Sequence, residues 1–392
     1  MKYISALFGL FGLLVPATIF AQVKVPFILQ ENKCVFVEVK VNDDPKPLLF
    51  FFDTGAGTTL IDQRVAQELG IRSTYTETVS GSSGQKDFHV AEGQKLSFWE
   101  SIVIDDVDII IEDTSRIGKS LGRAFAGIIG YDLLHKYITR VDFDHKEFWI
   151  YETPEQAVTE GFSKYDITMT DAIPIPHLDV TFTLKDRSSY TGKVLFDSGA
   201  GLNLLINSQF IEQHQLFDKM PNRLIATQND LTSKGFITLS TIESLSFFDY
   251  QFDKPMIAHL STDKGGVSAM PGYLGILGAE IINRFNFIID YSNKVLYLQP
   301  NRMYDLPIDT KVFPFRLVEE DNKVVVQHII DHTDAAKQGI KAGDEILEVN
   351  RQPVKDLLWV KEQIKLSEGA VHLKIRNANN KVEDKTFRLT SL

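Results

Sequence analysis

Two segments of the chain carry almost the same pattern, and this repeat constrains the fold more than any other feature. The first is Phe51-Phe52-Asp53-Thr54-Gly55-Ala56-Gly57, and the second is Leu195-Phe196-Asp197-Ser198-Gly199-Ala200-Gly201. Each copy reads as an apolar strand that ends in an Asp, a hydroxyl residue and a turn of small residues. Because the whole pattern returns in the same order, we expect two similar lobes.

Each copy is followed by a second matching segment. Gly127-Ile128-Ile129-Gly130-Tyr131 follows the first copy, and Gly275-Ile276-Leu277-Gly278-Ala279 follows the second. The Asp and the last Gly of that segment are 77 residues apart in the first copy (53 to 130) and 81 in the second (197 to 278). This common order predicts that the two halves share one arrangement of strands.

Short runs rich in Val, Ile, Phe and Tyr fill both halves, and their period of two predicts strands. One short helix is expected after each Asp turn, at 62–69 and at 208–214. The sequence therefore predicts a mainly β protein with a first lobe at 22–153, a connector at 154–164 and a second lobe at 165–305. The last two strands of each half are expected to pack at the junction between the lobes.

A third unit is predicted at residues 310–392. A strand at 324–330 precedes a capped helical turn that ends at Gly339. Apolar residues at 357–366 fit one side of a helix, and 371–376 alternates as a strand. We expect this unit to be a small α+β domain with a core of its own.

Composition excludes several classes of function. The chain of 392 residues has a formal net charge of -11 and no basic tract, which argues against nucleic-acid binding. Its single cysteine, Cys34, excludes an intramolecular disulfide framework and a cysteine-rich metal site. The motifs of zinc proteases, serine hydrolases and phosphate-binding loops are absent from the sequence, so we expect no metal and no organic cofactor.

The first 21 residues differ from the rest of the chain. Lys2 precedes an almost wholly apolar run from Ala6 to Phe20, and Ala21-Gln22 supplies a small residue at the end. This pattern predicts a secretory signal peptide at 1–21, either cleaved or retained as an N-terminal anchor. No later stretch reaches the roughly 18 apolar residues of a membrane span. We expect an exported protein that is periplasmic, envelope-associated or extracellular.

The two Asp residues provide a catalytic pair. Hydrolysis of an uncharged carbonyl needs a base for the water and an acid for the leaving group, and two carboxyls sharing one proton supply both. Two carboxylates about 4 Å apart would repel each other by about 4 kcal/mol at an effective dielectric near 20. One of Asp53 and Asp197 must therefore stay protonated, and the sequence does not decide which.

The residues after each Asp fit this task. The absence of a side chain at Gly55 and Gly199 allows each loop to turn sharply and the two loops to approach closely. Thr54 and Ser198 place a hydroxyl where it can bond across to the opposite loop. We expect the loops to support each other.

These motifs resemble the aspartic proteases of the pepsin and retropepsin clan, in a single-chain, two-lobed bacterial form. The resemblance covers about residues 25 to 300 and implies two pseudo-symmetric, retropepsin-like β lobes. It implies that Asp53 and Asp197 are the catalytic dyad. Gly130 and Gly278 would close the apolar loops beneath it. An inactive two-lobed relative remains the alternative.

Members of this clan cover the cleft with a glycine-rich hairpin. The segment Gly81-Ser82-Ser83-Gly84 lies in the corresponding interval of the first half, and Gly235 marks a second-lobe counterpart. Both segments are candidate flaps, and both also fit ordinary surface hairpins.

The third unit resembles a PDZ domain, chiefly through the run from Ala335 to Asn350. The resemblance implies a peptide groove, whose candidate residues are Phe313, Phe315, Leu317, Leu357 and Leu358. The loop that would hold a peptide carboxylate lacks the usual glycine and contains Pro314, which has no amide donor. Packing of this unit against the lobes is the alternative.

The leading hypothesis is an exported aspartic endopeptidase that acts on peptides or proteins. The alternative is a non-catalytic envelope protein that binds peptides in the cleft and the PDZ-like domain. Since both Asp residues lie in one chain, a monomer suffices for catalysis.

Overall fold

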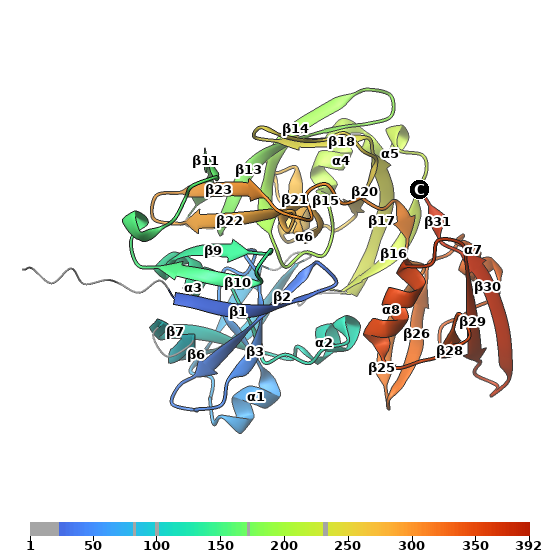
Figure 1. Cartoon of the computed structure of the whole chain (residues 1–392), viewed down its shortest axis with the longest axis horizontal. Helices are drawn as coiled ribbons and strands as arrows, with labels where there is room; N and C mark the ends of the chain where they lie inside the picture. The colour runs from blue at the N-terminus through green and yellow to red at the C-terminus, as the bar shows by residue number, and fades with distance from the viewer. Residues whose placement is uncertain (1–22, 81–83, 99–101, 171–172, 230–233) are drawn as a thin grey trace, which may run out of the picture.

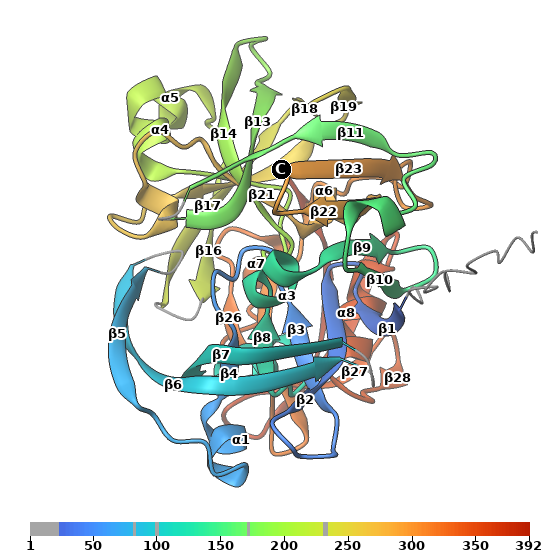
Figure 2. The ribbon, with the colours of Figure 1, turned by 90° about the vertical axis from the view of Figure 1, so that its left-hand side faces the viewer.

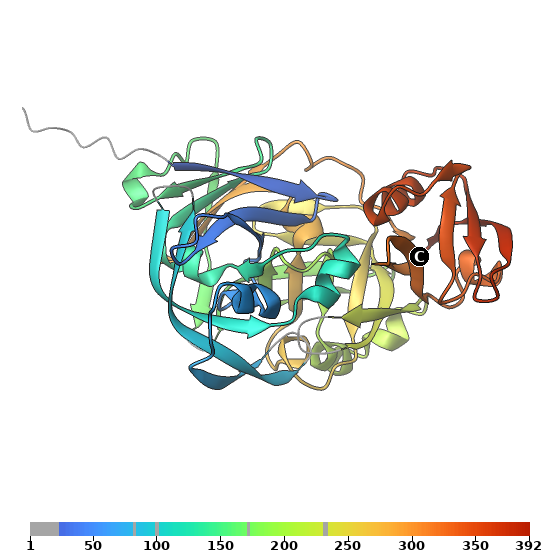
Figure 3. The ribbon, with the colours of Figure 1, turned by 90° about the horizontal axis from the view of Figure 1, so that it is seen from below.

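The computed structural model describes residues 23–80, 84–98, 102–170, 173–229 and 234–392, and the predicted signal peptide therefore lies outside the described residues. The protein is mainly β, as predicted, with two lobes and a smaller C-terminal domain (Figure 1). Seen from below, the C-terminal domain lies at one end of the two lobes (Figure 3).

The first lobe is built from strands with three short helices and a 3-10 turn. Its strands are β1 (Val23–Gln30), β2 (Cys34–Val41), β3 (Leu48–Phe52), β4 (Leu60–Asp62), β5 (Tyr75–Ser80), β6 (Gln85–Phe98), β7 (Ile102–Glu112), β8 (Gly127–Ile129), β9 (Ile138–Asp142) and β10 (Glu147–Tyr151). Its helical elements are α1 (Gln63–Glu68), α2 (Ser115–Leu121), α3 (Tyr131–Lys136) and η1 (Pro154–Gln156). The helix α1 begins after Asp62, whose side chain accepts a hydrogen bond from the Arg64 amide.

The second lobe repeats this order. Its strands are β11 (Ser163–Asp166), β12 (Thr168–Thr170), β13 (Ile173–Thr183), β14 (Ser189–Asp197), β15 (Leu204–Ile206), β16 (Leu224–Asn229), β17 (Lys234–Ile242), β18 (Ser244–Phe247), β19 (Tyr250–Phe252), β20 (Met256–Ser261), β21 (Gly275–Gly278), β22 (Phe285–Asp290) and β23 (Val295–Pro300). Its helical elements are α4 (Ser208–His214), α5 (Leu216–Lys219), η2 (Val267–Ala269) and α6 (Ala279–Ile282). As expected, α4 follows the second Asp turn.

The two lobes share one sheet. The last strands of the halves pair antiparallel, with Phe287 of β22 opposite Val141 of β9, inside the run β11-β23-β22-β9-β10-β1. This agrees with the expected position of the terminal strands. The predicted connector at 154–164 is only partly a linker, because β11 begins at Ser163 and pairs with β23.

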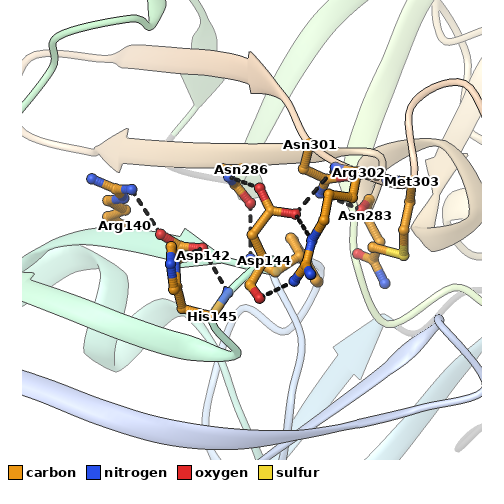
Figure 4. Close-up of polar contacts among 10 residues, drawn as sticks. Arg140, Asp142, Asp144, His145, Asn283, Asn286, Asn301, Arg302 and Met303 are labelled. Carbon is orange, nitrogen blue, oxygen red and sulfur yellow. Dashed lines mark hydrogen bonds and ion pairs between the residues drawn. The ribbon is translucent and has the colours of Figure 1, made fainter.

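Polar contacts reinforce this junction (Figure 4). Asp144 of the first lobe accepts hydrogen bonds from Arg302 Nε at 2.9 Å and from Asn286 Nδ2 at 3.0 Å. Asn286 is buried, and its Oδ1 accepts from the Phe143 amide at 2.8 Å. The lobes are therefore joined by side chains as well as by backbone pairing.

The C-terminal domain has a separate core around Val326, Val349 and Val360, all fully buried. Its elements are β24 (Lys311–Val312), β25 (Phe315–Glu320), β26 (Lys323–Ile329), α7 (Asp334–Lys337), β27 (Glu345–Val349), β28 (Gln352–Pro353), α8 (Leu357–Lys365), β29 (Ala370–Arg376), β30 (Val382–Arg388) and β31 (Thr390–Ser391). Within the part of the chain that the structure describes, no helix is long and apolar enough to cross a membrane.

Candidate active site

The two Asp loops lie at equivalent points of the two lobes. β3 pairs parallel with β8, and β14 pairs parallel with β21, where Asp197 lies opposite Gly278. The Asp53 amide donates to the Ile129 carbonyl at 2.9 Å. Each Asp is thus held by the second segment of its repeat.

Glycines bring the two loops into contact. A Cβ on Gly55 would lie 2.5 Å from Cγ of Asp197, and a Cβ on Gly199 would overlap with the carboxyl of Asp53. Each glycine therefore packs directly on the carboxyl of the opposite loop. The two predicted site residues Asp53 and Asp197 face each other between the lobes.

The hydroxyl groups of Thr54 and Ser198 each hydrogen-bond to the opposite loop, and Thr54 makes more of these bonds. Thr54 Oγ1 donates to the Phe196 carbonyl at 2.7 Å and accepts from the Ser198 amide at 2.9 Å. Ser198 Oγ accepts from the Thr54 amide at 3.0 Å. Both side chains are buried, so these bonds are shielded from water.

Backbone amides hold the carboxyl oxygens. Asp53 Oδ1 accepts from the amides of Gly55 at 2.7 Å and Gly199 at 3.1 Å, one from each loop. Asp197 Oδ1 accepts from Gly199 and Ala200, both at 2.9 Å and both from its own loop. Each carboxyl therefore accepts two amide hydrogen bonds, which favour its charged form.

Burial and mutual repulsion keep one proton on the pair. Burial raises the pKa of Asp53 above its usual value, although amide donors partly oppose the shift. Burial and the charge of Asp53 raise the pKa of Asp197 well above its usual value. The pair therefore titrates as a unit and holds one proton between Asp53 and Asp197.

Glycines also support the loops from behind. A Cβ on Gly130 would overlap with the Asp53 carbonyl oxygen, and one on Gly278 with the Leu202 carbonyl oxygen.

Asp132, which the sequence did not single out, accepts from Thr59 Oγ1 at 2.6 Å and from the Thr59 amide at 2.8 Å. This bond ties α3 to the chain after the first Asp turn. The sequence signal that could have identified Asp132 is its position directly after Gly130-Tyr131.

A cleft of about 1620 Å³ opens above the pair. Asp53 and Asp197 line its floor, and its walls are mostly apolar, with Phe51, Phe88 and Ile128 among the first-lobe residues. On the second-lobe side Leu205, Ile237 and Ile276 line it.

The β5–β6 hairpin of the first lobe and the β16–β17 hairpin of the second lie near each other on one side of the molecule (Figure 2). Thr78 and Val79 of β5 line the cleft from the first lobe, and Ala226 and Thr227 of β16 line it from the second. Of the candidate flap residues, Gly81, Ser82 and Ser83 lie outside the described residues. Gly84 approaches the second lobe, because a Cβ on Gly265 would lie 3.9 Å from its Cα. Gly235 pairs with Gln228 in the second hairpin and is not among the residues that line the cleft.

The five candidate residues of the PDZ groove do not share one groove. Phe315, Leu317 and Leu357 belong to the core of the C-terminal domain. Phe313 and Phe315 also line the cleft between the lobes. Leu358 packs against the first lobe, where a Cβ on Gly122 would lie 3.3 Å from its Cγ. The apolar pattern selected core and interface positions because it cannot separate these from a ligand groove.

Among the described residues, no three His, Cys, Asp or Glu side chains are grouped so that they could hold a metal ion.

Two family models match parts of the chain. Residues 37–133 match the family model of aspartyl proteases, and residues 310–376 match that of PDZ domains. No curated protein matches the chain. Among solved structures, the chain is similar to the aspartic proteinase from Irpex lacteus, with 13% identity, a TM-score of 0.45, and coverage of 74% of this chain and 100% of that chain.

The fold and the paired loops define a two-lobed protein of the aspartyl-protease type. The chain contains an aspartyl protease domain followed by a PDZ domain.

Proposed function

We propose that the protein is an aspartic endopeptidase whose catalytic residues are Asp53 and Asp197. The observation that carries this proposal is the reciprocal packing of the two loops, in which each glycine lies on the opposite carboxyl. Two carboxyls so placed share one proton and can act as a base and an acid in the same step.

In the proposed reaction, the Asp53 carboxylate takes a proton from a water molecule while the water oxygen attacks the peptide carbonyl carbon. The proton on Asp197 moves to the carbonyl oxygen, which gives a neutral tetrahedral diol. The diol collapses when a hydroxyl proton returns to Asp197 and the proton on Asp53 passes to the departing nitrogen. The C–N bond breaks, and a carboxylic acid and an amine are released without a covalent intermediate.

The test uses purified protein and a mixed peptide library over acidic to neutral pH. Asp53→Asn and Asp197→Asn are each expected to lower kcat/KM by about 10²–10⁴-fold or more, the usual share of acid–base catalysis. The exposed Asp218→Asn variant is the matched control and should cleave like the wild type. If the wild type and Asp53→Asn show the same negligible cleavage, the enzyme proposal fails for that substrate set and the alternative of a non-catalytic peptide-binding protein is favoured.

We also propose that the enzyme is exported, because residues 1–21 have the charge and apolar pattern of a signal peptide. Mass spectrometry of the protein recovered from its native cells tests this. A mature chain that begins near Gln22 is expected, whereas a cytoplasmic chain that retains Met1 would oppose export.

A further inference from the structure

The PDZ domain docks on the first lobe with the walls of its own expected peptide groove. Gly122, at the end of α2, packs on Leu357 and Leu358 of α8. Lys361 of α8 donates to the Ser120 carbonyl of α2 at 2.7 Å. Figure 1 places α2 beside β25 and α8. The first lobe therefore packs on α8, which carries the candidate groove residues Leu357 and Leu358.

The same domain also docks on the second lobe. Val312 and Ile330 are 2% and 5% exposed, and they share a buried apolar cluster with Leu205, Ile237 and Ile276. These three second-lobe residues line the cleft. Burial of these two aliphatic side chains stabilises the contact.

The β1–β2 turn connects the three parts. Glu31 forms ion pairs with Lys365 at 2.6 Å and Lys361 at 3.7 Å in the PDZ domain. Two residues later, Lys33 pairs with Glu280 of the second lobe. The turn belongs to the first lobe, so all three parts meet at one end of the cleft.

The cleft runs without interruption from the Asp pair to the PDZ domain. Its lining includes Asp53 and Asp197 at one point and Val312, Phe313 and Ile330 at another. The domain lies at one end of both lobes in the view from below (Figure 3). A polypeptide bound across the Asp pair would meet the domain on one side only.

We propose that the PDZ domain is the end wall of the substrate cleft and limits how far a bound polypeptide extends on one side of the scissile bond. This inference rests on the proposed function. It assigns the substrate class as oligopeptides, or polypeptides cleaved near one end, rather than the interior of long unfolded chains.

The first test measures binding, so that it does not depend on cleavage. Uncleavable statine-containing peptides are prepared in a short form and with a flexible extension of about ten residues, which adds up to about 33 Å, on either the N-terminal or the C-terminal side. The wild type is expected to lose about 10-fold or more in affinity for one extended form and to bind the other like the short peptide. Equal affinity for all three forms would overturn the end wall alone. Failure of every peptide to bind would overturn the proposed function and the end wall together.

The second test weakens the docking contact. Glu31→Gln removes the carboxylate that pairs with two PDZ lysines and should reduce the penalty for the blocked extension by at least about 3-fold. Glu147→Gln is the matched control, because Glu147 is also paired, with Lys24, and both carboxylates have side chains that are 22% exposed. The end-wall proposal would be contradicted if Glu31→Gln bound the short peptide normally and still lost as much affinity for the blocked extended peptide as the wild type does. Lys361→Met provides an independent variant from the other side of the contact.

The third test locks the domain in place. A Cβ on Gly122 would lie 3.4 Å from Cβ of Leu357, close to the spacing of a disulfide. The Gly122→Cys/Leu357→Cys variant is compared with itself in oxidised and reduced forms, so any strain at Gly122 is common to both. Burial raises the pKa of the Cys34 thiol to about 11, which keeps it out of exchange. We expect the penalty for the blocked extension to be larger in the oxidised form, and an equal penalty in both forms would contradict the proposal.

Discussion

At the scale of single residues, the site depends on where one proton lies. Asp53 receives amide donors from both loops, and Asp197 receives them only from its own. This difference is small in the sequence, where the two loops differ only by Thr54 against Ser198 and by the residue before the Phe. The difference in hydrogen bonds therefore comes from how the two lobes pack.

The raised pKa of Asp197 makes stability depend on pH. Burial and the charge of Asp53 raise that pKa, so the folded protein holds the proton more tightly than the unfolded chain. The free energy of unfolding should then fall as pH rises above the usual carboxyl value of 3.8, until the folded pKa is passed. Asp197→Asn has no proton to lose there, so its free energy of unfolding should fall less between pH 4 and pH 7. Urea denaturation at both values checks this, with Asp218→Asn as the control, and parallel pH profiles for wild type and Asp197→Asn would contradict it.

Thr54 Oγ1 makes two hydrogen bonds to the opposite loop and Ser198 Oγ makes one, so mutations at the two positions should destabilise the fold unequally. Thr54→Ala leaves both the Phe196 carbonyl and the Ser198 amide without their partner, whereas Ser198→Ala leaves only the Thr54 amide. Each buried group without a partner costs about 1–3 kcal/mol. Thr54→Ala should therefore lower the free energy of unfolding more than Ser198→Ala does. Thr54→Ser, which keeps the hydroxyl, serves as the control in chemical denaturation, and a larger loss for Ser198→Ala would refute the asymmetry.

At the scale of elements, the two Asp turns are positioned by strands that the sequence defines well. The repeated motifs predicted the β3 and β14 turns, the helices α1 and α4, and the packing of the terminal strands at the junction between the lobes, because each element has a strong local pattern. The pairing of β9 with β22 in one sheet was not predicted. The sequence did not predict α2, which has seven residues. Its role depends on contacts with α8, distant in sequence, which no local periodicity records. The part of β11 in the connector was missed for the same reason.

Glycine at position 199 is a test of how closely the two turns must approach. A methyl group there would overlap with the carboxyl of Asp53, so Gly199→Ala must separate the loops. Displacement of catalytic groups by about 1 Å can cost about 10²-fold in rate, so kcat should fall by about that factor. Gly369→Ala is the control, since no atom lies within 4 Å of a Cβ placed there. Wild-type kcat in a folded Gly199→Ala protein would contradict the observed packing.

At the scale of the whole molecule, the position of the PDZ domain depends on charge. Burial opposes ionisation of Glu31, but Lys365 and Lys361 outweigh it and lower its pKa below 4.5. Lys33 and Cys34 are the neighbouring groups on its own side of the contact. A lowered carboxyl pKa contributes stability that is present above about pH 4.5 and is lost as pH falls through the folded value.

Docking of the PDZ domain should accordingly weaken in acid. Amide hydrogen exchange of α8 and α2 is expected to be faster relative to the core of β27 at pH 3.5 than at pH 6, after correction for intrinsic rates. The Glu31→Gln variant should show a smaller change. If α8 and α2 keep the same relative protection at both values, Glu31 does not control the contact.

The sheet shared by the two lobes also determines how cooperatively the protein unfolds. β9 and β22 pair across the junction, and Phe287 contacts Phe143 and Phe196 with ring centroids 6.2 Å and 5.5 Å apart. Unfolding of either lobe would expose apolar surface of the other, so we expect the two lobes to unfold together as one cooperative unit. Most buried apolar residues of the PDZ domain form a separate core, so we expect this domain to unfold in a transition of its own, although Val312 and Ile330 pack on the second lobe. Scanning calorimetry should therefore resolve two heat-absorption transitions rather than three, and the larger should have a van't Hoff enthalpy equal to its calorimetric enthalpy.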